Sequence, residues 1–354
     1  MPDVAPLVPE NVAKLLERFR RTKVLVVGDL MLDEFVWGRV NRISPEAPVP
    51  VVWIQSESLM PGGASNVANN IRALGGHVQL AGAVGTDRWG TQLLDELEKR
   101  QIGTTAILRS ASRPTTVKTR VIAHHQQVVR VDREQKGALD VTLMARLIDA
   151  VRKQLDVVDA VIIEDYAKGV ITRAMLEAIV PLARQKRKII TVDPKEEHFD
   201  LYRGVTALTP NRAEAGAAVD RELETEEAVI EAGEQLLRQL RSDGILITMG
   251  EDGMCLFEPG GQRTRIPTVA QEVFDVAGAG DTVIATFTLA LASGATMSEA
   301  AMLANYAAGI VVGKLGVAVT TPEELLSRLR GAAAPRRPRP SIRRPVSGPP
   351  RGKR

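Results

Sequence analysis

The stretch Asp275-Val-Ala-Gly-Ala-Gly-Asp281 precedes an Ala-rich run that predicts a helix ending near Ser293. The first N–H groups of a helix have no partner inside it, and the helix dipole favours an anion there. Gly278 and Gly280 let such an anion approach the main chain closely. Asp281, in the first turn, is placed to accept a proton from an attacking hydroxyl. The stretch combines a base with an anion cradle, as phosphoryl transfer requires, although the same residues also fit a simple capped helix start.

Two polar clusters accompany predicted elements nearer the N-terminus. Gly62-Gly63-Ala-Ser-Asn66 opens a second predicted helix, and its amide side chain can both donate and accept hydrogen bonds with sugar hydroxyls. Asp29 and Asp33 follow the apolar run 24–28, which is a predicted buried strand. Open α/β sheets bind ligands at the carboxyl ends of their strands, so both carboxylates are candidate acceptors for sugar hydroxyls. The alternative is that one of them caps the turn.

The remaining pattern predicts an α/β fold. Strand-like and helical runs alternate regularly from residue 142 onward, which favours a largely parallel sheet covered by helices on both faces. Two β-rich patches, residues 33–57 and 115–132, differ from this pattern. Together they predict a small discontinuous sheet, separate from the main one.

Composition and charge exclude several classes of protein. Hydrophobic residues make up 44% of the 354 residues, enough for a sizeable core. The single Cys255 excludes an internal disulfide framework and a multi-Cys zinc site. The net charge of +3 is misleading, because residues 331–354 contain eight Lys/Arg and no acid. Without them, 38 basic residues face 43 acidic ones, which argues against specific nucleic-acid binding by the folded body.

The two ends of the chain predict no membrane anchor. No apolar run approaches the roughly 18 residues of a membrane span, and residues 11–19 show an amphipathic helix pattern instead of a signal peptide. We therefore expect a cytoplasmic protein. Residues 331–354 are rich in Pro, Arg and Gly, so a basic disordered tail is predicted there.

Three motifs in order carry a resemblance to a known family. Gly62-Gly63, Thr209-Pro-Asn211-Arg-Ala-Glu214 and Asp275–Asp281 have the order and separations seen in ribokinase-like (PfkB) carbohydrate kinases, which the chain resembles over roughly residues 22–330. The resemblance implies a three-layer α/β/α fold with a mostly parallel central sheet and a small discontinuous β-sheet lid from about 34–57 and 115–132. On this division, residues 1–21 are an N-terminal helical extension and residues 331–354 are the tail.

Further stretches are similar to the kinase domain of bacterial heptose-7-phosphate kinases. They are Val27–Gly38, Arg42–Val52, Pro61–Asn70 and Gln126–Asp132. That resemblance implies ATP-dependent phosphorylation of the anomeric C1 hydroxyl of D-glycero-β-D-manno-heptose 7-phosphate, on the route to ADP-heptose for lipopolysaccharide. Some such kinases are fused to a nucleotidyltransferase, and we expect this chain to resemble the stand-alone form because only the tail follows residue 330.

The family resemblance implies roles for the phosphate-binding residues. Asp281 is the expected base, and the backbone of Ala277, Gly278, Ala279 and Gly280 is the expected anion hole. The motif Asn211-Arg212-Ala213-Glu214 is expected to position Mg²⁺ and the ATP phosphates, with Glu214 as the metal residue, mainly through water. Mg²⁺ prefers oxygen ligands and keeps several waters, which agrees with that role. An N-terminal capping box made by Asn211 and Glu214 is a reading compatible with it.

Other residues are assigned to the nucleotide and sugar sides. Thr248, Gly250 and Gly253 form the expected nucleotide-side turn. Asn305 is expected to flank adenine, or else to be an exposed helix amide, and Lys195 to meet a phosphate or remain solvated. The expected sugar-binding residues are Asp29, Asp33, Gly62, Gly63, Asn66, Arg120 and Lys168. A sugar phosphate also needs a cation, and Arg42, Lys118, Arg120, Arg130 and Lys168 are unranked candidates.

The lid also predicts an assembly. Its exposed edges and apolar residues such as Val49, Val51 and Trp53 predict a homodimer formed through the β lid. Competing readings are another sugar kinase of ribokinase or fructokinase type, a catalytically silent nucleotide- or sugar-binding regulator, and a basic-tailed nucleic-acid-binding protein.

Overall fold

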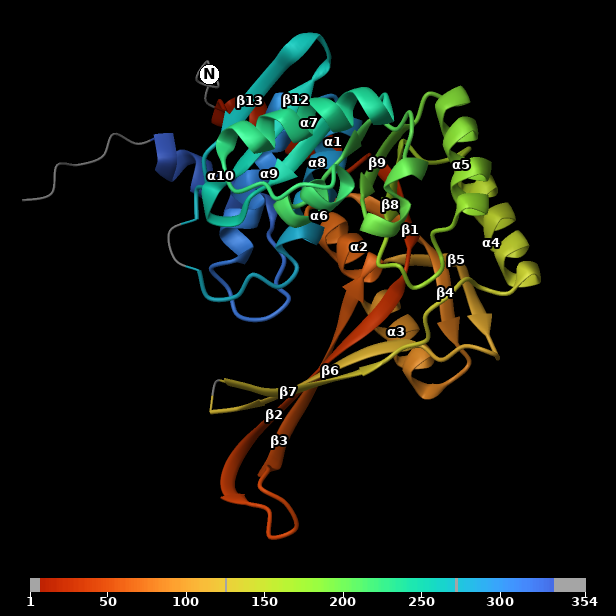
Figure 1. The fold of residues 1–354 in the computed structure, drawn as a ribbon, viewed down its shortest axis with the longest axis vertical. Coiled ribbons are helices and arrows are strands. Elements are labelled where there is room, and N and C mark those ends of the chain that lie inside the picture. Colours follow the sequence, from red (N-terminus) through yellow and green to blue (C-terminus); the bar gives the residue numbers. More distant parts are fainter. Residues whose placement is uncertain (1–6, 125, 271–272, 334–354) are drawn as a thin grey trace, which may run out of the picture.

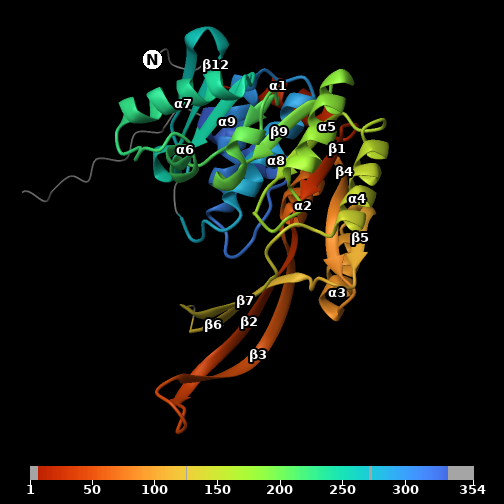
Figure 2. The same cartoon turned by 45° about the vertical axis from the view of Figure 1, so that its right-hand side comes forward.

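The computed structural model describes residues 7–124, 126–270 and 273–333. These residues form a layered α/β/α body and a small β-sheet that extends away from it (Figure 1; Figure 2). Both parts follow the predicted fold class. Within the described residues, no helix is both long and apolar enough to cross a membrane.

The central sheet is mostly parallel. Among the described residues it has nine strands in the order β13-β12-β11-β10-β9-β8-β1-β4-β5, and only β12 and β13 run antiparallel to their neighbours. The strands are β1 (Lys23–Gly28), β4 (His77–Gly85), β5 (Gly103–Ser110), β8 (Ala160–Glu164), β9 (Ile189–Asp193), β10 (Ala207–Leu208), β11 (Gly244–Thr248), β12 (Met254–Glu258) and β13 (Gln262–Ile266). All the parallel strands therefore end at one common edge.

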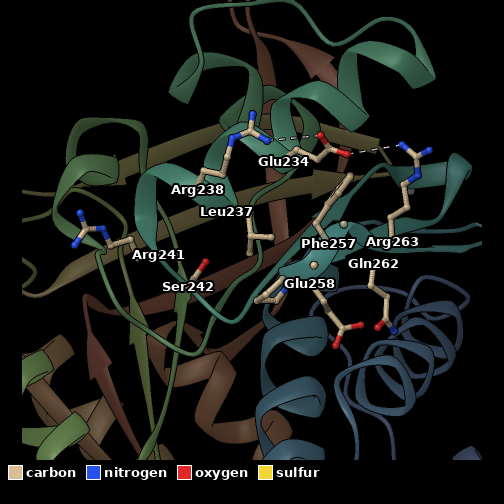
Figure 3. Close-up of a pocket in the computed structure, with 12 residues that line it drawn as sticks. Glu234, Leu237, Arg238, Arg241, Ser242, Phe257, Glu258, Gln262 and Arg263 are labelled. Atoms are coloured by element: carbon tan, nitrogen blue, oxygen red, sulfur yellow. Dashed lines mark ion pairs between the residues drawn. The ribbon is translucent and has the colours of Figure 1, made fainter.

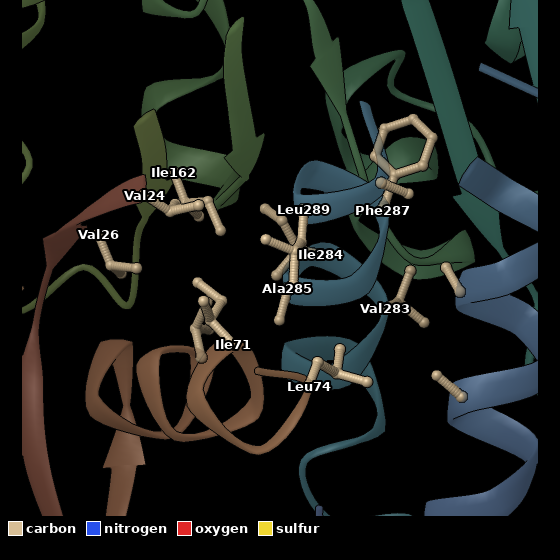
Figure 4. Close-up of a cluster of buried hydrophobic side chains, with 14 of the residues drawn as sticks. Val24, Val26, Ile71, Leu74, Ile162, Val283, Ile284, Ala285, Phe287 and Leu289 are labelled. Atoms are coloured by element: carbon tan, nitrogen blue, oxygen red, sulfur yellow. The ribbon is translucent and has the colours of Figure 1, made fainter. Parts of the chain in front are cut away.

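Alternating side chains of β1 build the two core layers. Successive residues of a strand point to opposite faces of the sheet. Val24 and Val26 pack in one cluster, and Leu25 and Val27 pack in the other. Helices of the first layer are α1 (Pro9–Phe19), α2 (Ala64–Ala73), α3 (Arg88–Lys99), α8 (Ala279–Ala292), α9 (Met297–Val311) and α10 (Pro322–Ala333); those of the second are α4 (Val141–Gln154), α5 (Arg173–Gln185), α6 (Arg212–Ala218) and α7 (Glu226–Leu240). Figure 4 shows the first cluster, where Ile71 of α2 and Ala285 of α8 meet the sheet.

The small sheet is the predicted lid. Its order is β3-β2-β6-β7, from β2 (Leu30–Ile43), β3 (Pro50–Gly63), β6 (Thr116–Ala123) and β7 (Gln126–Arg133). The pairs β2–β3 and β6–β7 are antiparallel hairpins, and β2 pairs with β6 in parallel. Two segments distant in sequence thus make one sheet, as the two β-rich patches predicted.

The ends of the chain differ slightly from the prediction. Helix α1 lies within the predicted extension 1–21, and its Phe19 is fully buried in the core. Helix α10 continues to Ala333, so the first three residues of the predicted tail are helical instead of disordered. The rest of that tail, 334–354, lies outside the described residues. Three short 3₁₀ turns, η1 (Glu196–Leu201), η2 (Gly250–Asp252) and η3 (Pro259–Gly261), complete the connections.

Phe287 offers a test of the core. Its side chain is fully buried on α8 in the first cluster (Figure 4). We expect Phe287→Ala to lower the free energy of unfolding by about 3–5 kcal/mol, because it removes buried apolar surface and leaves a cavity. Urea unfolding followed by circular dichroism measures the change. Val157→Ala, at an exposed position, is the control, and equal midpoints for the two variants would contradict this packing.

Candidate active site

The common edge of the parallel strands collects polar side chains. Glu164 ends β8, Asp193 ends β9 and Thr248 ends β11, and Asp29 follows β1 directly. Open α/β sheets bind ligands at this edge. The start of α8 reaches the same place, since Asp281 lies within 4.8 Å of Glu164 and Asp193, counted between carboxylate oxygens.

The glycine-rich start of α8 has the geometry of an anion site. Gly278 is the N-cap with φ of 77°, a left-handed conformation that favours glycine. A Cβ there would lie 2.8 Å from the Asn66 amide nitrogen, whereas a Cβ on Gly280 would meet nothing within 4 Å. The first turn is therefore closed on the Asn66 side and open at Gly280, where a ligand can approach its N–H groups.

Asp281 is held by two donors from distant elements. The Asn66 amide donates to Oδ2 at 2.6 Å, and the Tyr166 hydroxyl donates to Oδ1 at 3.0 Å. Burial raises the pKa of Asp281 above its ordinary value, while these two hydrogen bonds lower it. The result is an oriented carboxylate of raised basicity, which suits a general base.

Two further buried carboxylates lie beside the base. The side-chain oxygens of Glu164 are buried with no hydrogen-bond partner among the described residues. Burial, with the nearby Asp193 and Asp281, raises the pKa of Glu164 well above its ordinary value. Burial also raises the pKa of Asp193 to about 8. Protons or a divalent cation must offset so much negative charge, and an all-oxygen donor set with an unsatisfied member fits Mg²⁺.

Asn211 and Glu214 form the N-terminal capping box that the sequence allowed beside a role at Mg²⁺. Asn211 Oδ1 accepts from the Glu214 N–H at 2.9 Å, and Glu214 Oε2 accepts from the Asn211 N–H at 3.0 Å. Glu214 Oε1 pairs with Lys195 Nζ at 3.2 Å, so Lys195 has an acidic partner. Arg212 pairs with Asp252 at 2.5 Å. The negative charge of Glu214 lies near enough to Asp193 to help raise the pKa of Asp193. The role of Glu214 in positioning Mg²⁺ stays a prediction.

Four of the predicted nucleotide residues line one cavity of about 450 Å³. Thr248, Gly250, Gly253 and Asn305 lie in its wall with Ala279 and Gly280 of α8. Val276, Val283 and Val312 add an apolar lining that suits a base such as adenine. Asn305 is only 4% exposed and donates to the Pro267 carbonyl at 2.8 Å, so the exposed-amide alternative is wrong.

The sugar side contains Asp33 with its neighbours. Arg120 Nη1 pairs with Asp33 Oδ1. A Cβ on Gly62 would lie 2.3 Å from Asp33 Oδ2, so a larger residue there would displace this carboxylate. Gly63 has φ of 54° where β3 turns into α2. The structure therefore brings Asp33, Gly62 and Arg120 together, and their sugar-binding role stays a prediction.

Three predicted sugar-binding residues have other partners in the structure. Asp29 Oδ2 accepts from the N–H groups of Tyr166 and Lys168, at 3.1 and 2.9 Å, and Oδ1 from that of Val170 at 3.1 Å. Asp29 is 3% exposed, and these hydrogen bonds fix the loop after β8 instead of the turn that follows β1. The Asn66 amide nitrogen is bonded to Asp281, and Lys168 Nζ pairs with Glu134 at 2.7 Å.

Some residues of the site were not predicted. No role was assigned to Glu164, Tyr166 or Asn70 from the sequence. Asn70 Oδ1 accepts from the Thr282 hydroxyl at 2.8 Å and ties α2 to α8. The available signal was position, since Glu164 and Tyr166 come where β8 reaches the ligand-binding edge.

A second cavity, of about 550 Å³, lies away from these residues. It is lined by the C-terminal half of α7 and the β12–β13 hairpin, and it contains none of the predicted site residues. Figure 3 shows Glu234 there between Arg238 and Arg263, at 3.7 and 3.8 Å. It lies toward the far end of β12 from Gly253, so it does not belong to the site at the carboxyl edge.

The sequence model of the pfkB family carbohydrate kinases matches residues 21–324. The chain belongs to this family. It is accordingly a phosphotransferase that acts on a sugar hydroxyl, which confirms the predicted enzyme class.

The chain is also similar to relatives that carry an individual protein name. The chain is 44% identical over 320 residues to the bifunctional protein HldE of Geobacter sulfurreducens, covering 90% of this chain and 65% of that protein. It is 45% identical over 319 residues to HldE of Citrifermentans bemidjiense, covering 90% and 66%. The chain thus spans just under two thirds of the length of these relatives.

Solved structures support the fold. Phosphofructokinase-2 from Escherichia coli, in complex with substrates and products, has a TM-score of 0.73 at 18% identity, covering 88% of this chain and 99% of its own. Arabidopsis thaliana ribokinase, complexed with ribose and ATP, has a TM-score of 0.68 at 18% identity, covering 87% and 98%. The predicted ribokinase-like fold is confirmed.

The Tyr166–Asp281 hydrogen bond predicts a pH effect. Its donor favours the charged form of Asp281, so Tyr166→Phe should raise the pKa of that carboxyl. A base works deprotonated, so the acid limb of the kcat/KM profile should move to higher pH. Sugar phosphorylation measured across pH tests this, with Tyr306→Phe as the control. An unmoved acid limb would show that the hydrogen bond does not tune the base.

Proposed function

We propose that the chain transfers the γ-phosphoryl group of ATP to the anomeric C1 hydroxyl of D-glycero-β-D-manno-heptose 7-phosphate, giving the 1,7-bisphosphate. The observation that carries the kinase part is the Asp281 carboxylate, oriented by Asn66 and Tyr166 between the Asp33 side and the nucleotide cavity. The heptose part rests on the motif resemblance and on the relatives named HldE. Such an enzyme acts in the cytoplasm, in ADP-heptose and lipopolysaccharide core synthesis.

The residues divide the work of the transfer. Asp33 and the Gly62-Gly63 turn hold sugar hydroxyls, and Asp281 removes the C1 proton as the hydroxyl attacks. The N–H groups at the start of α8 face the moving phosphoryl group and stabilise its charge. The cavity at Thr248, Gly253 and Asn305 holds the nucleoside.

Mg²⁺ supplies charge neutralisation at the ATP phosphates when it is bound. Asp193 and Glu164 are the buried carboxylates that would hold it, with Glu214 reaching it through water. The ion pair with Lys195 holds the Glu214 carboxylate near the carboxyl edge of the parallel strands.

Product analysis tests the substrate. Purified protein with MgATP and heptose 7-phosphate should give a product heavier by one phosphate in mass spectrometry, with no comparable product from ribose or fructose. Phosphorylation of ribose or fructose in preference to the heptose phosphate would favour a ribokinase- or fructokinase-like role. No product from any sugar would favour a silent regulator.

Asp281→Asn tests the base. The amide keeps the size of the side chain but cannot take a proton, so kcat should fall by about 10²–10⁴-fold. A coupled ADP-release assay measures the rate, and circular dichroism checks the fold. Asp243→Asn, at an exposed position outside the site, is the matched control. Full activity of Asp281→Asn would remove Asp281 from the mechanism.

We also propose a homodimer formed through the lid. Trp53 is 67% exposed on the edge strand β3, and Ile54 beside it is 51% exposed. On the opposite edge strand β7, Val129 and Val131 are exposed as well. Pairing two lids would cover apolar faces and unpaired strand edges at once.

Trp53→Glu tests the dimer. A charge in an apolar interface should raise the dimer dissociation constant more than about tenfold, as loss of an aromatic anchor does. Light scattering coupled to size exclusion measures the mass across concentrations, with Val157→Glu on the body as the control. A dimer unaffected by Trp53→Glu would place the interface elsewhere.

A further inference from the structure

The structure separates the five cations that could meet a sugar phosphate. Arg120 pairs with Asp33, and Lys168 Nζ pairs with Glu134 at 2.7 Å. Arg130 Nε and Nη2 donate to the two carboxylate oxygens of Asp132, at 2.8 and 2.9 Å. Each of these three already has a carboxylate partner.

Arg42 lies too far from Asp33 to bind the phosphate of a sugar held there. It lies on the outer half of β2, opposite Val51 of β3, and it is exposed. Asp33 lies nine residues earlier on the same strand, near the body. A side chain so far along a strand does not reach a sugar bound at Asp33.

Lys118 is the remaining cation, and its setting is unusual. It has no ion-pair or hydrogen-bond partner among the described residues, although it is only partly exposed. Its Nζ lies 5.3 Å from the centre of the Tyr166 ring, the same tyrosine that donates to the base. Burial lowers the pKa of Lys118, and Asp33 raises it. A desolvated ammonium group with no paired carboxylate is stabilised by an incoming anion.

The register of the lid places Lys118 at the sugar site. Lys118 of β6 is the partner of Asp33 on β2 and of Asp132 on β7, so the three form one row across the sheet. Arg120 lies two residues further along β6, on the same face as Lys118. A sugar held by Asp33 therefore has two cations beside it, Arg120 and Lys118, and Lys118 is the one without a carboxylate partner among the described residues.

We propose that Lys118 is the residue that recognises the phosphate group of the sugar substrate, and so selects phosphorylated over unphosphorylated sugars. This assignment rests on the proposed function, in that the substrate carries a phosphate away from the reacting hydroxyl. The ammonium group of Lys118 donates to phosphate oxygens, while Asp33 binds hydroxyls and Asp281 takes the proton. Because Lys118 belongs to the lid and Tyr166 to the body, the contact of Lys118 with the Tyr166 ring links the two.

Paired substrates test this. Wild type, Lys118→Met and Lys118→Arg are assayed with heptose 7-phosphate and with the same heptose lacking phosphate, and likewise with fructose 6-phosphate and fructose. Lys118→Met should raise KM for the phosphorylated sugar by about 10- to 100-fold, the value of a hydrogen bond to a charged group. The KM of the unphosphorylated sugar should stay nearly unchanged, and Lys118→Arg should restore most of the selectivity. Lys153→Met, on the exposed face of α4, is the matched control.

The outcomes separate this assignment from the proposed function. Equal losses for phosphorylated and unphosphorylated sugars would mean that Lys118 acts on the base or the fold, and would overturn the assignment. So would selectivity lost in Lys168→Met and kept in Lys118→Met. A wild type that uses fructose 6-phosphate and not heptose 7-phosphate overturns only the heptose proposal, and the fructose pair then decides on Lys118. A wild type indifferent to the phosphate overturns both.

Discussion

The site depends on a buried carboxylate that two neutral donors keep oriented. Tyr166 comes from the loop after β8 and Asn66 from α2, and both converge on Asp281 in the first turn of α8. Without them, burial alone would favour the protonated acid, which is no base. The loop that carries Tyr166 is itself fixed by the three hydrogen bonds that Asp29 accepts. Asp29 therefore supports the chemistry without needing to touch a substrate.

The sequence predicts features that depend on neighbouring residues in the chain, and it does not predict contacts between residues far apart in the chain. The alternation of strands and helices and the helix start at Gly278–Asp281 depend on neighbours in the chain, and both were found. The Tyr166–Asp281 hydrogen bond joins residues 115 positions apart, and no periodicity reports such a pair. The cations could not be ranked for the same reason, because Arg120, Arg130 and Lys168 are distinguished from Lys118 only by partners that the fold brings to them.

Some residues allowed two interpretations from the sequence, and the structure excludes one interpretation for Asn305 but not for Asn211 and Glu214. Asn305 looks like a solvent-facing amide in an Ala-rich helix, yet packing of α9 buries it against the Pro267 carbonyl. Asn211 and Glu214 form the capping box, and the same carboxylate stands beside Asp193. Capping occupies Oε2 of Glu214, while Oε1 pairs with Lys195, so the capping box leaves one carboxylate oxygen for a second contact.

The lid joins the body with almost no connecting chain. Strand β2 begins one residue after Asp29, and β3 runs directly into α2 through Gly63, where it pairs with Leu30. The base of the hairpin is therefore fixed to the body at both strands, next to Asp29 and Gly63. Its tip, Ile43 to Pro50, lies far from the candidate site. Changes of length at that tip are insulated from the chemistry, whereas a single inserted residue at the root would turn Asp33 to the opposite face of the sheet. The register at the root of the hairpin is therefore what keeps Asp33 on the face of the sheet where it meets Gly62 and Arg120.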